Sequence, residues 1–470
     1  MRVWPYNDCI SEVIIMIHKA MDVKLVVKPL MGILVHTHFW EGPCRAGIRE
    51  NMEPEAEMRI AREKFEKCKQ LLVGLDPEVE LLEPVLVPYY QSFVVDEKIL
   101  EAIKDDVQRC DCIIILNQRI PKIERFGKPV ISCTHAVSAA DTCAYLRSIG
   151  MEGYYTIDRK ELDETLHMLW VRKAMRNTRA LVLTAGEIPT WGLLSNIKDL
   201  EGLRTRYGVE IVKKPFTEIF GFMDKVDMAE AKRICDELYS RSQESRVKPE
   251  YRVEDIVYYL AAKAMLDFYQ CNAFSTACVE LCISQVPQKR KFVPCITHSL
   301  LKDEGIPSFC EEDLNAMMAM TLMMYTARRP AFMGNPLYEN DEIVTLHHSV
   351  PCLKMNGFGS EGLKYSIYAF TGQGFGGKIQ IDFAQNKDSK VTLCRFDPSG
   401  TKMLMKVGEV LESRYTDFYC SPWYFIKVDD ARKYLHHIMD FGHHQVLIFG
   451  DYSRQLSQMA ELLGITIVEG

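Results

Sequence analysis

The chain has 470 residues, of which 47% are hydrophobic and 26% are charged, and its net charge is −7. This length and composition predict a globular protein of roughly two to four domains with ample buried core. The acidic balance argues against nucleic-acid binding as the main activity, so no nucleic-acid partner is expected. The 16 cysteines contain no CxxC pair, which disfavours a zinc ribbon and indicates a reducing, cytoplasmic environment.

No segment predicts a signal peptide or a membrane span. The apolar run at residues 13–17 is short and is followed by His18 and Lys19. The most apolar window, residues 316–325, is far shorter than the roughly 20 residues that a bilayer requires. Its methionines could form a binding surface, but a buried core helix is the better interpretation, and no membrane partner is expected.

The first third of the chain alternates between strand and helix patterns. Strands are expected at residues 31–38, 79–87, 111–116 and 128–132, and helices at 55–75 and 96–109. Strands separated by helices predict a parallel α/β sheet with both faces covered. His36 and His38 stand at the carboxyl end of the first strand, where open sheets bind ligands, so they are candidate substrate-binding residues. The alternative is that local hydrogen bonds satisfy both rings.

A second α/β unit follows a helix expected at residues 162–175. Strands are expected at 179–186 and 209–213, with helices at 199–207, 228–241 and 253–269. The loop 186–192 lacks a dinucleotide fingerprint, and its Trp191 is a candidate substrate-binding residue. The run 277–282 has a strand-like apolar pattern interrupted by Glu280. A buried acid there would need a partner or a metal, whereas on an edge strand Glu280 would face water.

The most acidic stretch lies at a turn signal made by Gly305 and Pro307. Glu311, Glu312 and Asp313 follow it and open a long apolar helix at residues 314–327. A carboxylate in the first turn is favoured by the helix dipole, so these acids could simply be helix caps. Three consecutive acids exceed what a cap needs, and such oxygens together with imidazole build sites for hard cations.

The composition changes after this helix. Residues 343–420 are rich in closely spaced strand patterns, which predict an antiparallel sheet or a small barrel. The glycine-rich segment 372–377 lacks the ending of a P-loop and is better interpreted as a turn between strands. A helix at 429–439, a strand within 442–450, a final helix and a strand at 464–468 close the chain. We therefore expect three domains, at residues 1–172, 173–342 and 343–470.

Several motifs in order resemble the L-fucose/L-arabinose isomerase superfamily, nearest its L-fucose isomerase-like branch. They are Pro294-Cys295, the block from Gly305 to Asp313, the block from Thr326 to Asn335, Leu346-His-His348 and Gly442-His-His444. The resemblance implies two Rossmann-like parallel α/β units followed by a β-rich C-terminal domain. It also implies a metal-dependent aldose–ketose isomerase, an intramolecular oxidoreductase acting on a sugar.

The resemblance assigns roles to individual residues. Glu311 or Asp313 matches the family's second carboxylate, Glu280 is the expected first carboxylate, and His444 matches the C-terminal histidine ligand. These four residues are the expected metal ligands, and the three carboxylates are also the expected catalytic groups. The expected substrate-binding residues are His348, His443, His36, His38 and Trp191. The branch often has His-Cys where this chain has His348-Ser349.

The residue types suit this chemistry. Moving a proton between C1 and C2 through an enediol requires a base, a second proton-moving group and a Lewis acid. The family usually uses Mn²⁺, and Mg²⁺, Co²⁺ and Zn²⁺ are alternatives. Family members are oligomers with active sites near subunit interfaces, and the surface around Phe39-Trp40 is the expected contact.

Two alternatives to an isomerase remain open. One is a metal-dependent epimerase or hydrolase with the same ligands, and the other is a non-catalytic sugar-binding or regulatory protein on the same fold. The particular sugar, whether fucose, arabinose or a modified or acidic hexose, is left open.

Overall fold

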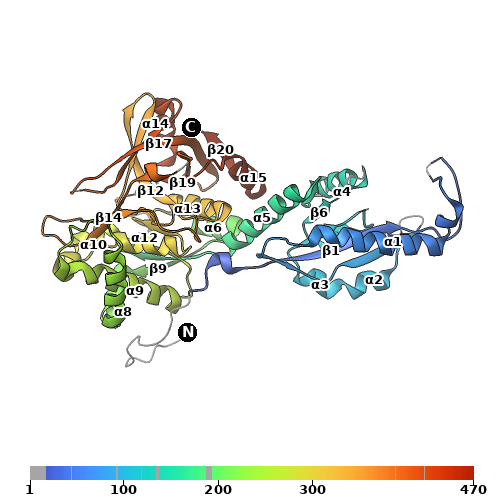
Figure 1. Ribbon diagram of the computed structural model, residues 1–470, viewed down its shortest axis with the longest axis horizontal. Helices are drawn as coiled ribbons and strands as arrows, with labels where there is room; N and C mark the ends of the chain where they lie inside the picture. Colours follow the sequence, from blue (N-terminus) through green and yellow to red (C-terminus); the bar gives the residue numbers. More distant parts are fainter. Residues whose placement is uncertain are drawn as a thin grey trace. The chain divides into compact units, whose positions relative to one another are not determined.

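A computed structural model describes residues 17–470 except 44, 91–93, 118, 134–136, 187–192, 387 and 418. The chain divides into two compact units (Figure 1). The N-terminal unit is Val23–Lys173, and the main unit is Ala174–Gly470 together with the segment that ends at Asp22. The boundary expected at residues 342 and 343 lies inside the main unit.

The N-terminal unit is built on a mostly parallel sheet. Its strands are β1 (Leu25–Leu34), β2 (Val79–Leu81), β3 (Val85–Tyr90), β4 (Val94–Val95), β5 (Cys112–Ile115), β6 (Val130–Cys133) and β7 (Gly153–Thr156). The strand order is β4-β3-β1-β5-β6-β7, with β2 beside β1, and among the described residues only β3 and β4 pair antiparallel. The helices are α1 (Pro54–Cys68), α2 (Glu97–Ala102), α3 (Lys104–Arg109), α4 (Val137–Ser148) and α5 (Arg159–Arg176). The parallel α/β arrangement expected for this region is confirmed.

The first strand differs from the expected range 31–38. It begins at Leu25 and ends at Leu34, so both histidines follow it in a loop. Lys28 and Pro29 interrupt the apolar pattern and conceal the first half of the strand. Lys28 is nevertheless buried, because its ammonium group donates to the Glu83 carbonyl at 2.7 Å and pairs with Asp106.

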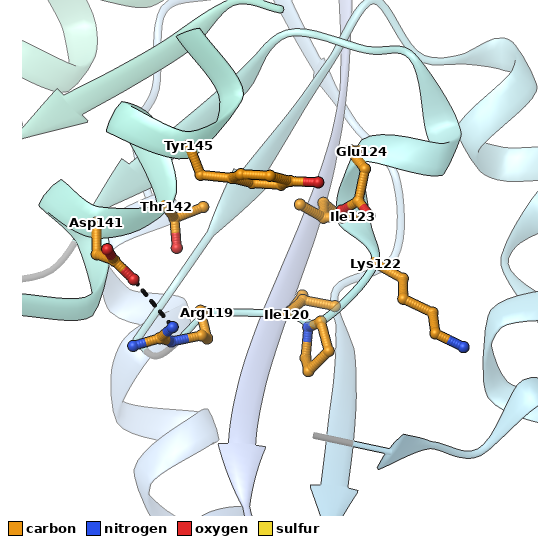
Figure 2. A pocket seen from close by; sticks show the side chains of 9 residues that line it. Arg119, Ile120, Lys122, Ile123, Glu124, Asp141, Thr142 and Tyr145 are labelled. Atoms are coloured by element: carbon orange, nitrogen blue, oxygen red, sulfur yellow. Dashed lines mark ion pairs between the residues drawn. The ribbon is translucent and has the colours of Figure 1, made fainter. Parts of the chain in front are cut away.

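A cavity of about 270 Å³ is lined by the segment that follows β5 and by helix α4, which follows β6 (Figure 2). Arg119 and Asp141 form an ion pair at 3.0 Å in its wall. Ile123 and the ring of Tyr145 line another part of it.

The main unit contains a second parallel sheet, of strand order β11-β10-β8-β9. The strands are β8 (Arg179–Thr184), β9 (Glu210–Pro215), β10 (Ala273–Thr276) and β11 (Ser308–Cys310). Its helices are α6 (Leu200–Tyr207), α7 (Ile219–Met223), α8 (Met228–Ser240), α9 (Arg252–Phe268), α10 (Cys278–Ile283), α11 (Val286–Arg290), α12 (Cys295–Asp303) and α13 (Leu314–Ala327).

The expected strand at 277–282 is wrong, because these residues form the short helix α10. The amide of Leu281 donates to the Ala277 carbonyl at 2.8 Å and that of Ser284 to the Glu280 carbonyl at 3.0 Å, which is the helical pattern. The strand is β10, immediately before it. A short apolar run cannot be assigned to helix or strand by periodicity alone.

The C-terminal part of the main unit is rich in strands, as expected. The strands are β12 (Phe332–Asn340), β13 (Ile343–His347), β16 (Lys390–Phe396), β17 (Lys402–Arg414), β18 (Trp423–Lys427), β19 (Gln445–Phe449) and β20 (Thr466–Glu469). Their order is β16-β19-β12-β13-β18-β17-β20, and a further pairing of β16 with β17 closes the sheet into a barrel. A hairpin of β14 (Tyr365–Ala369) and β15 (Gly377–Ile381), and helices α14 (Ala431–Phe441) and α15 (Ser453–Leu463), complete this part.

Helix α13 is the core of the main unit. Every residue from Leu314 to Thr326 is buried, which confirms the core helix expected from the methionine-rich window. It packs against β11 of the parallel sheet and against β16 and β19 of the barrel. The segment before it is therefore fixed between the two sheets. Among the described residues no helix is long and apolar enough to cross a bilayer.

Asn315, in the first turn of α13, ties three segments together. Its side chain is fully buried and accepts from the amide of Ile197 at 2.9 Å. It also donates to the carbonyls of Ser195 and Phe396, at 3.2 and 3.1 Å. A buried amide or carbonyl that loses its partner costs about 1–3 kcal/mol.

We therefore expect Asn315→Ala to lower the free energy of unfolding by about 3 kcal/mol or more, measured by urea denaturation. Thr321→Val on the same helix is the control, because the buried Thr321 hydroxyl has no hydrogen-bond partner among the described residues. This variant should be as stable as the wild type or more so. Equal losses in the two variants would contradict the assignment.

Candidate metal centre

The acidic segment lies where β11 ends and α13 begins. Cys310 is the last residue of β11, and Asp313 is the N-cap of α13, with its carboxylate accepting from the Ala316 amide at 2.9 Å. Glu311 lies between them. His348 follows β13, and His444 directly precedes β19. The fold thus brings together acids and histidines that are far apart in the sequence.

Glu311 and Glu312 are held in the left-handed backbone region, with φ of 61° and 58°. For a residue with a side chain this conformation costs roughly 1–2 kcal/mol, and such outliers concentrate at functional sites. The turn is fixed from both sides: the Glu312 amide donates to Ser275 Oγ at 3.0 Å, and the Glu312 carbonyl accepts from Asn196 at 2.7 Å. The strained turn places the Glu311 carboxylate beside the histidines.

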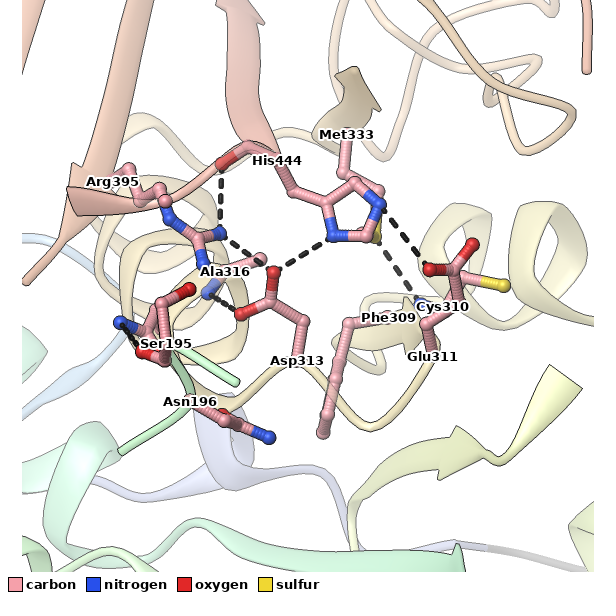
Figure 3. A network of polar contacts seen from close by, with 12 residues as sticks. Ser195, Asn196, Phe309, Cys310, Glu311, Asp313, Ala316, Met333, Arg395 and His444 are labelled. Atoms are coloured by element: carbon pink, nitrogen blue, oxygen red, sulfur yellow. Dashed lines mark hydrogen bonds and ion pairs between the residues drawn. The ribbon is translucent and has the colours of Figure 1, made fainter. Parts of the chain in front are cut away.

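Asp313 is fully buried and joins three groups (Figure 3). One oxygen caps α13, and the other accepts from Arg395 at 2.6 Å and from His444 Nδ1 at 2.8 Å. Burial alone would raise the pKa of Asp313, but Arg395 and His444 outweigh it and hold the pKa well below its usual range. Arg395, itself fully buried, also donates to the His444 carbonyl at 2.8 Å. Asp313 is therefore an ionised acceptor at neutral pH.

The ionised Asp313 fixes the tautomer of His444. A carboxylate only accepts hydrogen bonds, so Nδ1 of His444 carries a proton, and in the neutral form of the ring Nε2 presents a lone pair. Nε2 lies 3.8 Å from Glu311 Oε2 and has no hydrogen-bond partner within the part of the chain that the structure describes. Two acceptors therefore face each other in a buried place, an arrangement that a cation between them would satisfy.

Glu311 remains ionised in this environment. Burial raises its pKa, but the neighbouring imidazoles of His444 and His348 outweigh burial, and the pKa of Glu311 falls to about 2. Its carboxylate thus carries the negative charge that a cation site requires.

His348 has the opposite tautomer. The Ser349 amide donates to His348 Nδ1 at 3.1 Å, so the proton of the neutral ring is on Nε2. That nitrogen lies 3.5 Å from Glu311 Oε1, and burial lowers the pKa of His348, which favours the neutral ring. His348 therefore presents an N–H group to the carboxylate rather than a lone pair to a metal.

Two groups of side chains in the described chain bring three donor atoms within 4.8 Å of one another. One is Cys310, Glu311 and His348, and the other is Glu311, His443 and His444. In the first group His348 presents its proton, and the Cys310 thiol stays protonated: contact with Cys278 lowers its pKa, but burial and Glu311 raise it to about 11. In the second, burial and then His444 lower the pKa of His443 to about 4, so its ring is neutral at physiological pH. The second group is the better metal site.

The structure leaves two expected ligands outside this group. Asp313 uses both oxygens for the helix cap, Arg395 and His444, so it orients a ligand instead of binding a metal. Glu280 lies on α10 two residues after Cys278, whose thiol contacts that of Cys310. Residues two apart on a helix point about 200° apart, so Glu280 and Cys278 lie on different sides of α10.

Three further residues were expected to bind substrate. His36 belongs to the N-terminal unit, where its Nδ1 lies 3.0 Å from the Glu57 carboxylate, so it is satisfied locally. His38 in the same unit is exposed. Trp191 lies outside the described residues.

Sequence reasoning did not find Arg395. It occupies β16 within the apolar run Val391–Phe396, and every residue of this run is buried. A single arginine inside such a strand is a signal, because a buried guanidinium requires a carboxylate partner. The partner, Asp313, is 82 residues away in the sequence, so only the fold reveals it.

Comparisons with known proteins add no family assignment. The sequence matches no protein-family model and no curated protein. Among solved structures, it is similar to an ABC transporter solute-binding protein from Burkholderia multivorans, described with an unknown ligand interpreted as α-D-erythrofuranose. The identity is 10%, the match covers 65% of this chain and 95% of that chain, and the TM-score is 0.14. A likeness at this level supports no argument about fold or function.

The strained turn predicts a trade-off between stability and metal binding. Glu311→Gly relieves the left-handed backbone and removes the carboxylate, so it should raise the free energy of unfolding of the metal-free protein by about 1 kcal/mol while abolishing binding. Gln285→Gly is the matched control, because Gln285 has a φ of 62° at the start of α11. It should gain similar stability and keep its metal affinity. Urea denaturation and calorimetric titration provide the two measurements.

Acid stability offers a separate test near the site. The ring of His347 stacks on Trp423 with centroids 4.3 Å apart, and burial followed by His348 lowers its pKa to about 4. In the unfolded chain the pKa is about 6.5, so between these values the unfolded state binds more protons and stability falls as the pH falls. His347→Phe keeps the stack without a titrating group. Its melting temperature should therefore fall less than that of the wild type between pH 7 and pH 4.5; equal falls would contradict this account.

Proposed function

We propose that this protein is a metal-dependent aldose–ketose isomerase that acts on a sugar through an enediol. The observation that carries the proposal is the pair of facing acceptors, His444 Nε2 and Glu311 Oε2, separated by 3.8 Å. The hydrogen bond from His444 Nδ1 to Asp313 leaves Nε2 as the ring nitrogen that faces Glu311. The sequence resemblance to the L-fucose isomerase-like branch supplies the reaction.

Bound there, a divalent cation would polarise the carbonyl group of an open-chain sugar. The protein's own groups would move the protons. Glu311 Oε1, the oxygen beside His348, would take the proton from C2 and return it to C1. The Nε2–H of His348, 3.5 Å from that oxygen, would orient the carboxylate and would give its proton to O1 as the hydroxyl proton of O2 replaces it. Arg395 and Asp313 would hold His444 in place and would take no part in proton transfer.

The strand orders support the wider family layout. In both parallel sheets the first strand in the chain lies between two later strands, as in doubly wound folds: β3-β1-β5 in one unit and β9-β8-β10 in the other. We therefore include two Rossmann-like units before the barrel in the proposal. It also includes Mn²⁺ as the working ion, with Mg²⁺, Co²⁺ and Zn²⁺ as alternatives, a cytoplasmic location, and a homo-oligomer with active sites near subunit interfaces.

A metal-dependent hydrolase or epimerase is the second candidate. Two imidazoles and one carboxylate beside an open position also serve zinc hydrolases, and Glu311, His443 and His444 supply this set. Product analysis decides between the two: an aldose panel yields ketoses only from an isomerase. Release of a leaving group, or a product inverted at one carbon, would instead support the second candidate.

The tautomers predict different losses for different variants. His444→Ala should weaken metal binding first, with activity partly restored by excess Mn²⁺. Glu311→Gln should bind metal more weakly and lose about 10²–10⁴-fold in turnover even when saturated with metal, because the base is gone. His348→Ala should keep its metal affinity and raise KM or lower kcat.

His436→Ala is the control for these variants, because His436 lies exposed on α14. It should behave as the wild type in calorimetric titration with Mn²⁺ and in steady-state kinetics. Wild-type turnover in metal-saturated Glu311→Gln would overturn the proton-transfer role, and a protein that binds no divalent ion at all would overturn the proposal.

A further inference from the structure

We infer that His443 is a metal ligand, so that the ion is held by Glu311, His443 and His444. The inference rests on the proposed metal site and names its third donor. Within the described chain these three side chains place one donor atom each within 4.8 Å of one another. The sequence resemblance implies that His443 binds substrate, whereas we infer from the geometry that it binds the metal.

The local backbone brings the two imidazoles together. His443 and His444 lie between helix α14 and strand β19, and their ring centroids are 4.2 Å apart with an interplanar angle of 48°. Gly442 before them has a φ of 91°, and a Cβ there would lie 2.5 Å from Ser195 Oγ and 2.8 Å from an Arg395 nitrogen. The backbone thus packs directly on the Arg395 side chain that also holds Asp313. The buried Arg395 therefore contacts both the backbone before the two histidines and the Asp313 carboxylate that orients His444.

The other donors near Glu311 are already engaged. His348 presents a proton from Nε2, and both oxygens of Asp313 have partners. The Cys310 thiol contacts that of Cys278. His443 therefore remains as the neighbour that can complete a set of three around the His444 and Glu311 acceptors.

This donor set has consequences for the choice of ion. Imidazole suits borderline ions such as Zn²⁺ and Co²⁺, whereas Mn²⁺ prefers carboxylate and water oxygens. Two imidazoles and one carboxylate should therefore bind Zn²⁺ and Co²⁺ more tightly than Mn²⁺. Three protein ligands leave positions open for the neighbouring hydroxyl and carbonyl oxygens of a sugar.

Metal affinity in the full-length protein tests the inference without reference to turnover. The protein and its variants are stripped with a chelator, and competition titrations measure the Kd for Zn²⁺ and for Mn²⁺. His443→Ala should weaken Zn²⁺ binding by about 100-fold or more, since even residues that only support a ligand typically account for about 10–100-fold. Mn²⁺ binding should weaken less, so the preference for Zn²⁺ should shrink. His436→Ala should match the wild type in both titrations.

The outcomes separate this inference from the proposed function. Loss of binding in His444→Ala with wild-type affinity in His443→Ala would overturn the third ligand and leave the metal site intact. Failure of the wild type to bind either ion would overturn both. The unfolding transitions of the metal-free variants serve as the folding control, and His443→Gln repeats the test if His443→Ala does not fold.

The visible spectrum of the Co²⁺-loaded protein gives an independent check. Ligand-field bands that change on His443→Ala would support the assignment. A strong near-ultraviolet sulfur-to-cobalt band in the wild type that persists in this variant would assign the position to Cys310 and contradict it.

Discussion

The rest of the site depends on the hydrogen bonds and the ion pair of the Asp313 carboxylate. It is fully buried, and its partners come from α13, from β16 and from the turn before β19. A buried carboxylate without such partners would cost several kcal/mol, so the position is stable only while the arginine, the histidine and the helix end are all in place. The same contacts join the end of the parallel sheet to the barrel. Folding of the main unit and assembly of the site are therefore coupled.

That single carboxylate also determines the chemistry of its neighbours. By accepting from His444 Nδ1 it leaves Nε2 as a lone pair, while the Ser349 amide gives His348 the reverse tautomer. In the neutral forms of both rings, Glu311 lies between a nitrogen that accepts, His444 Nε2, and a nitrogen that donates, His348 Nε2. Its two oxygens consequently differ in role: Oε2 is placed to bind a cation, and Oε1 is placed to accept a hydrogen bond. Placing the Glu311 carboxylate there requires Glu311 and Glu312 to adopt the left-handed backbone conformation, which is energetically unfavourable.

The sequence predicted the layout well where patterns are long and regular. The parallel α/β sheets, the strand-rich C-terminal part and the buried helix α13 follow from hydrophobic periodicity. It failed at short elements: β1 was displaced because Lys28 and Pro29 interrupt the pattern, and α10 resembled a strand because six residues cannot show a helical period.

The sequence predicted which residues belong to the candidate site, but it did not predict how their side chains contact one another. The stretch around Glu311, with His348 and His444, was identified from residue types and from a family resemblance. The distinct role of Asp313 depends on Arg395 and His444, which are 82 and 131 residues away, and no local pattern encodes such contacts. Tautomers and the left-handed turn likewise depend on tertiary packing. Glu280 lies on a helix that the pattern concealed, so its position relative to the other acids could not be predicted either.

The most direct test of the central claim is a crystal of the protein soaked with Mn²⁺ and measured at the manganese absorption edge. The account predicts an anomalous peak between Glu311 Oε2 and His444 Nε2, with Asp313 still bonded to His444 Nδ1 and to Arg395. A peak bonded to Asp313 or Glu280, or no peak at saturating Mn²⁺, would contradict it.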